Sequence, residues 1–234
     1  MADLTLVLEA STGTGSLALI SGSAVVADAS VAMRARDGER LMPAVVELLR
    51  AAARSTTDIG RVVCSAGPGG FTGLRIGGAI GKGLAEALGI PLWSVSPLAL
   101  LAAGAGVRGA TDVLSILDAM RDEWYVRHFV REARDAGALS ARGETLRLTR
   151  GELEAFASAT GVGRGTGATI VGPGAGSFHG GVESTPMARD MVVLSEGELL
   201  HPVELASWEP DYGRLAEAQV KWEAAHGRAL GQAG

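Results

Sequence analysis

Four polar residues near the N-terminus have the types and spacing of a phosphate or metal site. Glu9 ends a short apolar run, and Ser11, Thr12 and Thr14 follow it in a turn-prone segment. The backbone amides of such a turn can hold an anion, and a carboxylate can reach a magnesium ion through water. Serine and threonine in a hairpin turn also bond their own backbone, which is the simpler interpretation. We keep Glu9, Ser11 and Thr12 as candidate nucleotide or phosphate residues, with the ordinary turn as the favoured alternative.

The glycine-rich segment 67–83 invites comparison with two nucleotide-binding loops and matches neither. A Walker A loop needs glycine five positions before its Gly-Lys pair and serine or threonine after it. Around Lys82 those two positions are Ile76 and Gly83. A dinucleotide fingerprint fails as well, because Thr72 takes the place of its third glycine. We expect neither loop type here.

Metal and hydrolase chemistry have little support. The single cysteine, Cys64, excludes an intramolecular disulfide and a multi-cysteine zinc site, and it ends an apolar run typical of a core strand. No two of the four histidines are three or four residues apart, as ligands on one helix face would be: they are His128, His179, His201 and His226. The Gly-x-Ser-x-Gly elbow of serine hydrolases is absent. We expect no catalytic residue, no metal site and no cofactor.

The composition argues against two broad classes of protein. The net charge is −5 and only 4% of residues are aromatic, so we do not expect the basic or stacking surface with which a protein binds tRNA alone. No apolar run reaches the ~18 residues of a membrane span. Asp3 precedes the first apolar run, unlike a signal peptide. The expected location is the cytoplasm.

The same order of elements occurs in both halves of the 234-residue chain. Each half has three predicted strands, a helix, a fourth strand and a Gly-Pro-Gly turn. The strands are 4–8, 16–20, 24–31 and 61–65 with a helix at 39–54, then 112–118, 124–130, 145–148 and 169–171 with a helix at 149–159. The first half adds a helix at 72–88, a strand at 92–95 and a helix opened by Pro97. The repetition predicts a duplicated α/β fold of two lobes, residues 1–108 and 109–234, with a cleft between them.

The predicted helix 72–88 carries glycine at every fourth position, in Gly73, Gly77 and Gly81. Each interior glycine costs up to ~1 kcal/mol relative to alanine, and the usual offset is close approach by another backbone. That backbone is either the protein's own sheet or a helix of a second protein. We favour the second protein, because the preceding helix has two adjacent apolar stripes, more than one sheet contact needs. The stripes are Leu41, Val45, Leu48 and Ala52, and Met42, Val46, Leu49 and Ala53.

These motifs resemble one known family. Segment 67–85 is similar to the Gly-Pro-Gly-Ser-Phe-Thr-Gly-Leu-Arg-Ile-Gly signature of the TsaB family, also called YeaZ, with Gly70 in place of serine. Segment 9–12 resembles the family's Asp-Thr-Ser-Thr hairpin, with Glu9 in place of aspartate. Segment 118–125 resembles its Asp-Ala-Arg-x-Gly-Glu-Val-Tyr motif, and 210–214 its Pro-x-Tyr-x-Arg motif. The resemblance implies a two-lobed actin-like fold, the RNase H-like class of sugar kinases, Hsp70 and actin.

The resemblance also implies a role. A TsaB protein is a non-catalytic subunit that pairs with its paralogue TsaD, the transferase that threonylcarbamoylates the adenosine next to the anticodon of tRNA. The ATPase TsaE joins the pair, and tRNA is reached only through the complex. TsaB is expected to form homodimers through the same surface when alone. TsaD relatives carry a metal-binding histidine pair at helical spacing, which this chain lacks.

The first two long helices are the pairing surface that the resemblance implies. Apolar residues would supply buried area, glycines close approach, and Arg75 and Lys82 charges at the rim. The expected interface residues are Leu41, Val45, Leu49, Thr72, Gly73, Arg75, Ile76, Gly77 and Lys82. Two other functions stay open at this point: a small-molecule kinase or ATPase that uses the cleft, and a protease.

Overall fold

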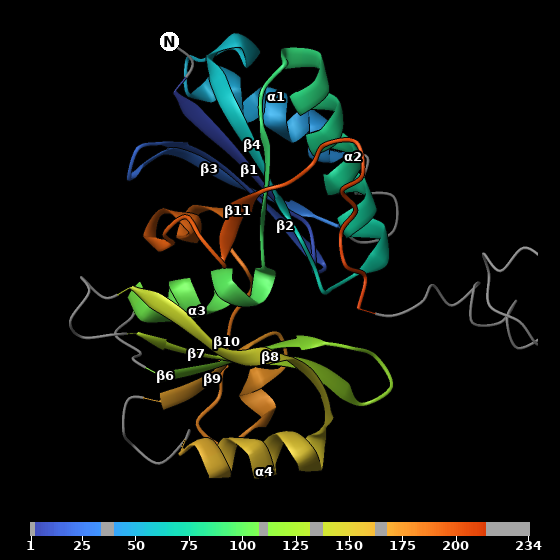
Figure 1. Ribbon diagram of the computed structural model, residues 1–234, viewed down its shortest axis with the longest axis vertical. Coiled ribbons are helices and arrows are strands. Elements are labelled where there is room, and N and C mark those ends of the chain that lie inside the picture. Colours follow the sequence, from blue (N-terminus) through green and yellow to red (C-terminus); the bar gives the residue numbers. More distant parts are fainter. Residues whose placement is uncertain (1–2, 34–39, 108–111, 132–137, 162–167, 214–234) are drawn as a thin grey trace, which may run out of the picture.

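The computed structural model describes residues 3–33, 40–107, 112–131, 138–161 and 168–213 as two β-sheets with helices between and outside them (Figure 1). Glu39 of the first predicted helix and Arg214 of the C-terminal motif lie outside the described residues.

The first sheet has the strand order β11-β5-β4-β1-β2-β3. Its central strand β1 (Leu4–Glu9) is buried along its whole length. Strand β1 pairs antiparallel with β2 (Thr14–Ser21) and parallel with β4 (Ile59–Ser65). A strand that is buried on both faces is expected to be apolar at every position. The residues from Leu4 to Leu8 are apolar except for Thr5. The remaining strands are β3 (Ala24–Ala32), β5 (Leu92–Val95) and β11 (Leu200–Pro202).

The second sheet repeats this topology, with the order β10-β9-β6-β7-β8. Its central strand β6 pairs antiparallel with β7 and parallel with β9, as β1 does with β2 and β4. The strands are β6 (Asp112–Asp118), β7 (Glu123–Arg131), β8 (Leu139–Thr149), β9 (Ala168–Gly172) and β10 (Val182–Glu183). The predicted duplication is confirmed: this is a two-lobed α/β fold of the actin-like class.

Helices cover the sheets in layers, as Figure 1 shows: α3 lies between the two sheets, with α1 and α2 outside the first sheet and α4 outside the second. A helix that is apolar on every side must be buried on every side, and α3 is such a helix. The helices are α1 (Leu41–Ala51), α2 (Phe71–Leu88), α3 (Pro97–Val107) and α4 (Arg150–Thr160), with short 3₁₀-helices η2 (Thr56–Asp58), η3 (Ala175–Ser177) and η4 (Ala188–Val193).

Strand β8 is longer than the predicted strand 145–148 and begins at Leu139. The regular extended backbone of β8, on which side chains alternate between the two faces of the sheet, is interrupted at Gly143, which has a left-handed φ of 72°. The pairing with β7 shifts register between Val126 and His128. A bulge of this kind breaks the period-two pattern from which a strand is predicted.

The chain returns to the first lobe after η4. Strand β11 pairs with β5, and residues 203–213, called the strap below, then run along α2. Lys82 Nζ donates to the Trp208 carbonyl at 2.9 Å, and the Asp211 amide donates to the Ala66 carbonyl at 2.8 Å. These bonds fix the strap to α2 and to the loop before it. The lobe boundary near residue 108 stays a prediction.

The β6–β7 turn yields a prediction about stability. Met120, Arg121 and Asp122 have left-handed φ values of 65°, 57° and 61°, a conformation that costs a non-glycine residue roughly 1–2 kcal/mol. Asp122→Gly removes part of this cost, so we expect the free energy of unfolding to rise by about 0.5–1 kcal/mol. Urea denaturation measures the change. Glu144→Gly, in strand β8, is the control and should destabilise; equal loss in both variants would contradict the prediction.

Candidate partner surface and hairpin site

Glu9 is fully buried at the end of β1, and its carboxylate is saturated by neighbouring serines. Oε1 accepts hydrogen bonds from the Ser11 amide at 2.6 Å and from the Ser11 hydroxyl, and Oε2 accepts one from the Ser65 hydroxyl. Burial raises the pKa of Glu9, and the bonds from Ser11 and Ser65 oppose this rise.

The rest of the hairpin turn bonds itself. The Thr12 hydroxyl donates to the Thr14 carbonyl at 2.9 Å and accepts from the Thr14 amide at 3.2 Å. Among the described residues, no group of three or more His, Cys, Asp or Glu side chains could hold a metal ion. The structure thus brings Glu9 and Ser11 together in the pattern of an ordinary self-bonded hairpin, the alternative favoured from the sequence.

The glycine ridge of α2 faces the protein's own first sheet. A Cβ added at Gly73 would overlap the Ala10 carbonyl oxygen, and one at Gly81 would overlap Cys64 Sγ. A Cβ at Gly77 would lie 3.4 Å from the Ala10 Cβ. This corrects the expectation that the ridge itself receives a partner helix: the close approach exists, but it is made within the chain. Cys64 lies in the core, as predicted.

The three interface residues expected on α1 also lie in the core. Leu41, Val45 and Leu49 are 0%, 0% and 4% exposed and pack with β1, β2 and β4 side chains. Leu49 of the second predicted stripe packs inward with the first stripe, whereas Val46 and Ala53 of that stripe are exposed, Val46 by 44%. The three expected interface residues therefore support α1 from beneath and cannot themselves touch a partner.

The face of α2 opposite the glycine ridge is open. Thr72, Arg75, Ala79 and Gly83 are exposed on it, and Ile76 is half-buried beside them. We call these five residues, with Val46 of α1, the outer surface: Val46, Thr72, Arg75, Ile76, Ala79 and Gly83. Lys82 differs from the expectation of a free rim charge, because its ammonium group bonds the strap.

Gly83 is the most informative residue of the outer surface. A Cβ added there would meet no described atom within 4 Å. A glycine inside a helix costs about 1 kcal/mol relative to alanine, and no described residue requires this one. Helical periodicity places Gly83 on the opposite side of α2 from the ridge glycines, but only the orientation of the helix shows which side faces the chain's own sheet.

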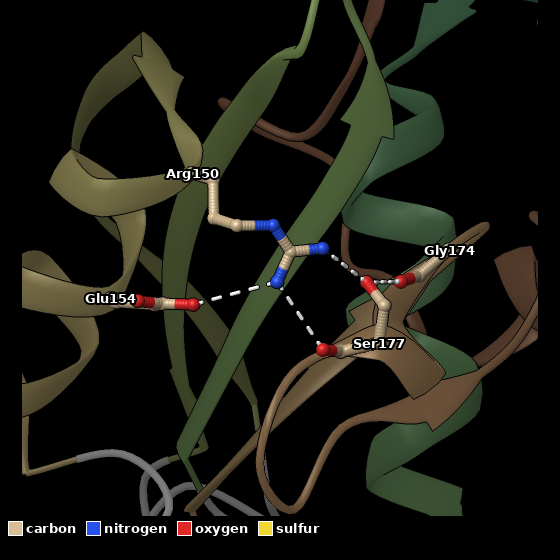
Figure 2. A network of polar contacts seen from close by, with 4 residues as sticks. All are labelled: Arg150, Glu154, Gly174 and Ser177. Atoms are coloured by element: carbon tan, nitrogen blue, oxygen red, sulfur yellow. Dashed lines mark hydrogen bonds and ion pairs between the residues drawn. The ribbon is translucent and has the colours of Figure 1, made fainter.

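The second Gly-Pro-Gly turn is closed by a network of polar contacts, shown in Figure 2, with an aromatic ring beside it. The Arg150 guanidinium donates to the Ser177 hydroxyl at 2.8 Å and lies 4.4 Å from the centre of the Phe178 ring. The Ser177 hydroxyl in turn donates to the Gly174 carbonyl at 2.8 Å. The Glu183 carboxylate accepts from the amide of Gly174 at 2.9 Å, so this turn does not offer a free anion site.

The duplicated topology, together with a self-bonded hairpin, defines a two-lobed actin-like protein with an open helical face. Comparison with known proteins gives the family. Residues 32–153 match the family model TsaD: tRNA N6-adenosine threonylcarbamoyltransferase, which is half of the chain. The chain therefore belongs to this family, and its relatives place it with the TsaB, or YeaZ, proteins.

Those relatives are as follows. The TsaB protein of tRNA threonylcarbamoyladenosine biosynthesis from Escherichia coli is 40% identical to this chain, over 40% of this chain and 41% of the relative. The TsaB protein from Bacillus subtilis is 36% identical, over 51% of this chain and 52% of the relative. The match spans about half the length of these curated relatives.

Two solved structures from Pseudomonas aeruginosa are similar over nearly all of their length. One is described as an uncharacterized protein with similarity to peptidase YeaZ, with a TM-score of 0.74 and 27% identity over 90% of this chain and 99% of that one. The other is YeaZ, with a TM-score of 0.72 and 26% identity over 89% and 99%. In the described part of this chain, no helix is long and apolar enough to cross a membrane.

The two faces of α2 predict opposite effects of the same substitution. Gly73→Ala pushes a methyl group into the Ala10 carbonyl, so it should lower the free energy of unfolding by about 2 kcal/mol or more. Gly83→Ala adds a methyl group in open space and should raise it by up to about 1 kcal/mol. Urea denaturation of both variants tests the orientation of the helix. The orientation would be refuted if Gly83→Ala were the more damaging change.

The buried carboxylate predicts a pH dependence of stability. Folding raises the pKa of Glu9 above its ordinary value of 4.5. The protonated Glu9 side chain therefore contributes to the free energy of unfolding below pH 4.5, and this contribution is lost as pH rises through the folded pKa. Glu9→Gln removes this loss, so the wild type should lose unfolding free energy relative to the variant as pH rises. Urea midpoints between about pH 4 and pH 8 measure the difference. A difference that is constant, or that moves in favour of the wild type, would exclude the assignment.

Proposed function

We propose that the protein is a non-catalytic subunit of tRNA threonylcarbamoyladenosine biosynthesis. The relatives named TsaB support the pathway. In this proposal the protein pairs with the TsaD transferase in the cytoplasm and activates it for threonylcarbamoylation of the adenosine next to the anticodon. TsaE joins the pair, tRNA is bound only by the complex, and the same surface forms a homodimer when TsaD is absent.

The outer surface is the observation that carries this proposal. Exposed Ala79 and Gly83 let a second helix approach α2 closely, and half-buried Ile76 supplies apolar area on the same face. Val46 is an exposed apolar residue of the neighbouring helix α1. A partner helix at this position accounts for a glycine that the chain's own packing does not require. Of the interface residues expected from sequence, Thr72, Arg75 and Ile76 are kept as direct contacts.

The other expected residues have supporting roles in this proposal. Gly73 and Gly77 set the orientation of α2, and Lys82 holds the strap against it. The side chains of Leu41, Val45 and Leu49 hold α1 on the sheet.

A kinase or ATPase that uses the interlobe cleft is the runner-up. It is disfavoured because the Glu9 carboxylate is buried and already accepts bonds from Ser11 and Ser65. A peptidase has still less support, because the sequence lacks the Gly-x-Ser-x-Gly elbow of serine hydrolases. Incubation with ATP and magnesium tests the runner-up, because saturating ligand raises the melting temperature of a protein that binds it.

An omission assay tests the proposed function. TsaD, TsaE, the enzyme that makes threonylcarbamoyl-adenylate, and tRNA are combined with and without this protein, and modified adenosine is quantified. We expect product only when the protein is present. Equal product without it would refute the subunit role.

A matched pair of variants connects the assay to the outer surface. Ala79→Arg places a long charged side chain on that surface, and we expect product formation at limiting protein to fall by about tenfold or more, as for loss of a central contact. Thr145→Arg makes the same kind of change on exposed strand β8 of the second lobe and should leave it unaltered. Full activity of Ala79→Arg would remove the outer surface as the pairing site.

A further inference from the structure

Arg75 and Phe71 of α2 and Tyr212 of the strap form a row of ring contacts near the start of the helix, called the ladder below. The Arg75 guanidinium carbon lies 5.2 Å from the centre of the Phe71 ring. The Phe71 and Tyr212 ring centres are 4.6 Å apart, with the planes inclined by 47°. Phe71 is 36% exposed, so the ladder presents both an apolar ring and a planar charge at the surface.

The ladder is held in place by the strap. Tyr212 follows Asp211, whose amide donates to the Ala66 carbonyl at 2.8 Å, and the Gly213 amide donates to the Asp211 carboxylate at 2.7 Å. Gly67 allows this contact, because a Cβ there would overlap the Asp211 carbonyl oxygen. A charge positioned this way loses little side-chain freedom when it binds, which is the physical basis of preorganisation.

Arg75 has a ring contact but no carboxylate partner among the described residues. Other arginines of the same structure are paired: Arg61 bonds Glu196 at 2.6 Å, and Arg189 bonds Asp28 at 2.9 Å. An exposed guanidinium that a ring contact orients, and that no described carboxylate engages, has donors available for a further acidic group. Its fork geometry matches a carboxylate.

The start of α2 favours the same sign of charge. Its N-cap residue, Gly70, provides no side-chain bond, and the first turn contains no acidic residue. The dipole of the helix therefore favours a negative group near this end. Phe71, Thr72 and Arg75 place the apolar, polar and charged parts of one patch on the first turns.

We propose that the ladder of Arg75, Phe71 and Tyr212 is the charge-specific end of the partner surface and receives a carboxylate side chain of the partner protein. This inference rests on the proposed function, since it takes the partner to be the TsaD transferase. It adds Phe71 and the strap residue Tyr212 to the surface, and it assigns the pairing charge to Arg75 alone, because Lys82 is engaged by the strap.

The test measures affinity for purified TsaD of the same organism at low and high salt, about 50 and 500 mM sodium chloride, where screening differs strongly. Arg75→Gln should bind about tenfold more weakly at low salt and should lose much of the salt dependence of the wild type. Arg75→Lys keeps the charge but not the fork, so it should fall between the two. Arg147→Gln, which removes an exposed charge from β8, should bind like the wild type.

The outcomes separate the two levels of the proposal. If the unchanged protein does not bind TsaD at all, the proposed function fails. If it binds, and Arg75→Gln binds with equal affinity and equal salt dependence, only the carboxylate pairing is refuted. Loss of inorganic phosphate binding by Arg75→Gln, with unchanged TsaD binding, would also refute it and make the patch a small-anion site. Thermal unfolding of each variant within a few degrees of the wild type confirms that folding is intact.

Discussion

The contact between the backbone of α2 and the β1–β2 hairpin is the constraint on which the rest of the structure depends. Gly73 lies against the Ala10 carbonyl, and the Gly70 amide donates to the Ser11 carbonyl at 2.7 Å. A Cβ at Gly73 would overlap the Ala10 carbonyl oxygen, so the absence of a side chain there permits the observed orientation of the helix. That orientation seals the hairpin in which Glu9 is buried, and it turns Ala79 and Gly83 toward solvent. This one close approach thus covers the β1–β2 hairpin, the candidate phosphate site, and leaves the opposite face of α2 exposed to solvent.

The duplication shows how the two lobes differ after their Gly-Pro-Gly turns. Both lobes place a Gly-Pro-Gly turn after the strand that runs parallel to the central one. In the first lobe the turn leads into the 18-residue helix α2; in the second it leads into η3, of three residues. The second turn is then occupied by its own Glu183 carboxylate and braced by Arg150. The two halves share a sheet topology, but the long glycine helix and its outer surface belong to one of them.

Much of the fold could be predicted from the sequence, because the spacing of apolar residues and the residue types in turns are local properties of the chain. The repeated order of elements and the core position of Cys64 agree with the structure. The direction in which the glycine ridge faces could not be predicted, since a period of four identifies residues on one side of a helix but not the neighbour on that side. The strap was missed for another reason: Lys82 binds backbone carbonyls of an irregular segment more than 120 residues away, and such a contact leaves no pattern in the sequence.

The central claim, that the outer surface of α2 receives the partner, can be measured through a single introduced thiol. Cys64 is buried and its pKa is raised to about 12, so it does not react with a maleimide under mild conditions. In Ala79→Cys, the labelling rate should fall by about tenfold or more when saturating TsaD is added, because the bound population is protected. In Thr145→Cys, on β8, it should not change. An unchanged labelling rate at position 79 in a complex that has demonstrably formed would contradict the claim.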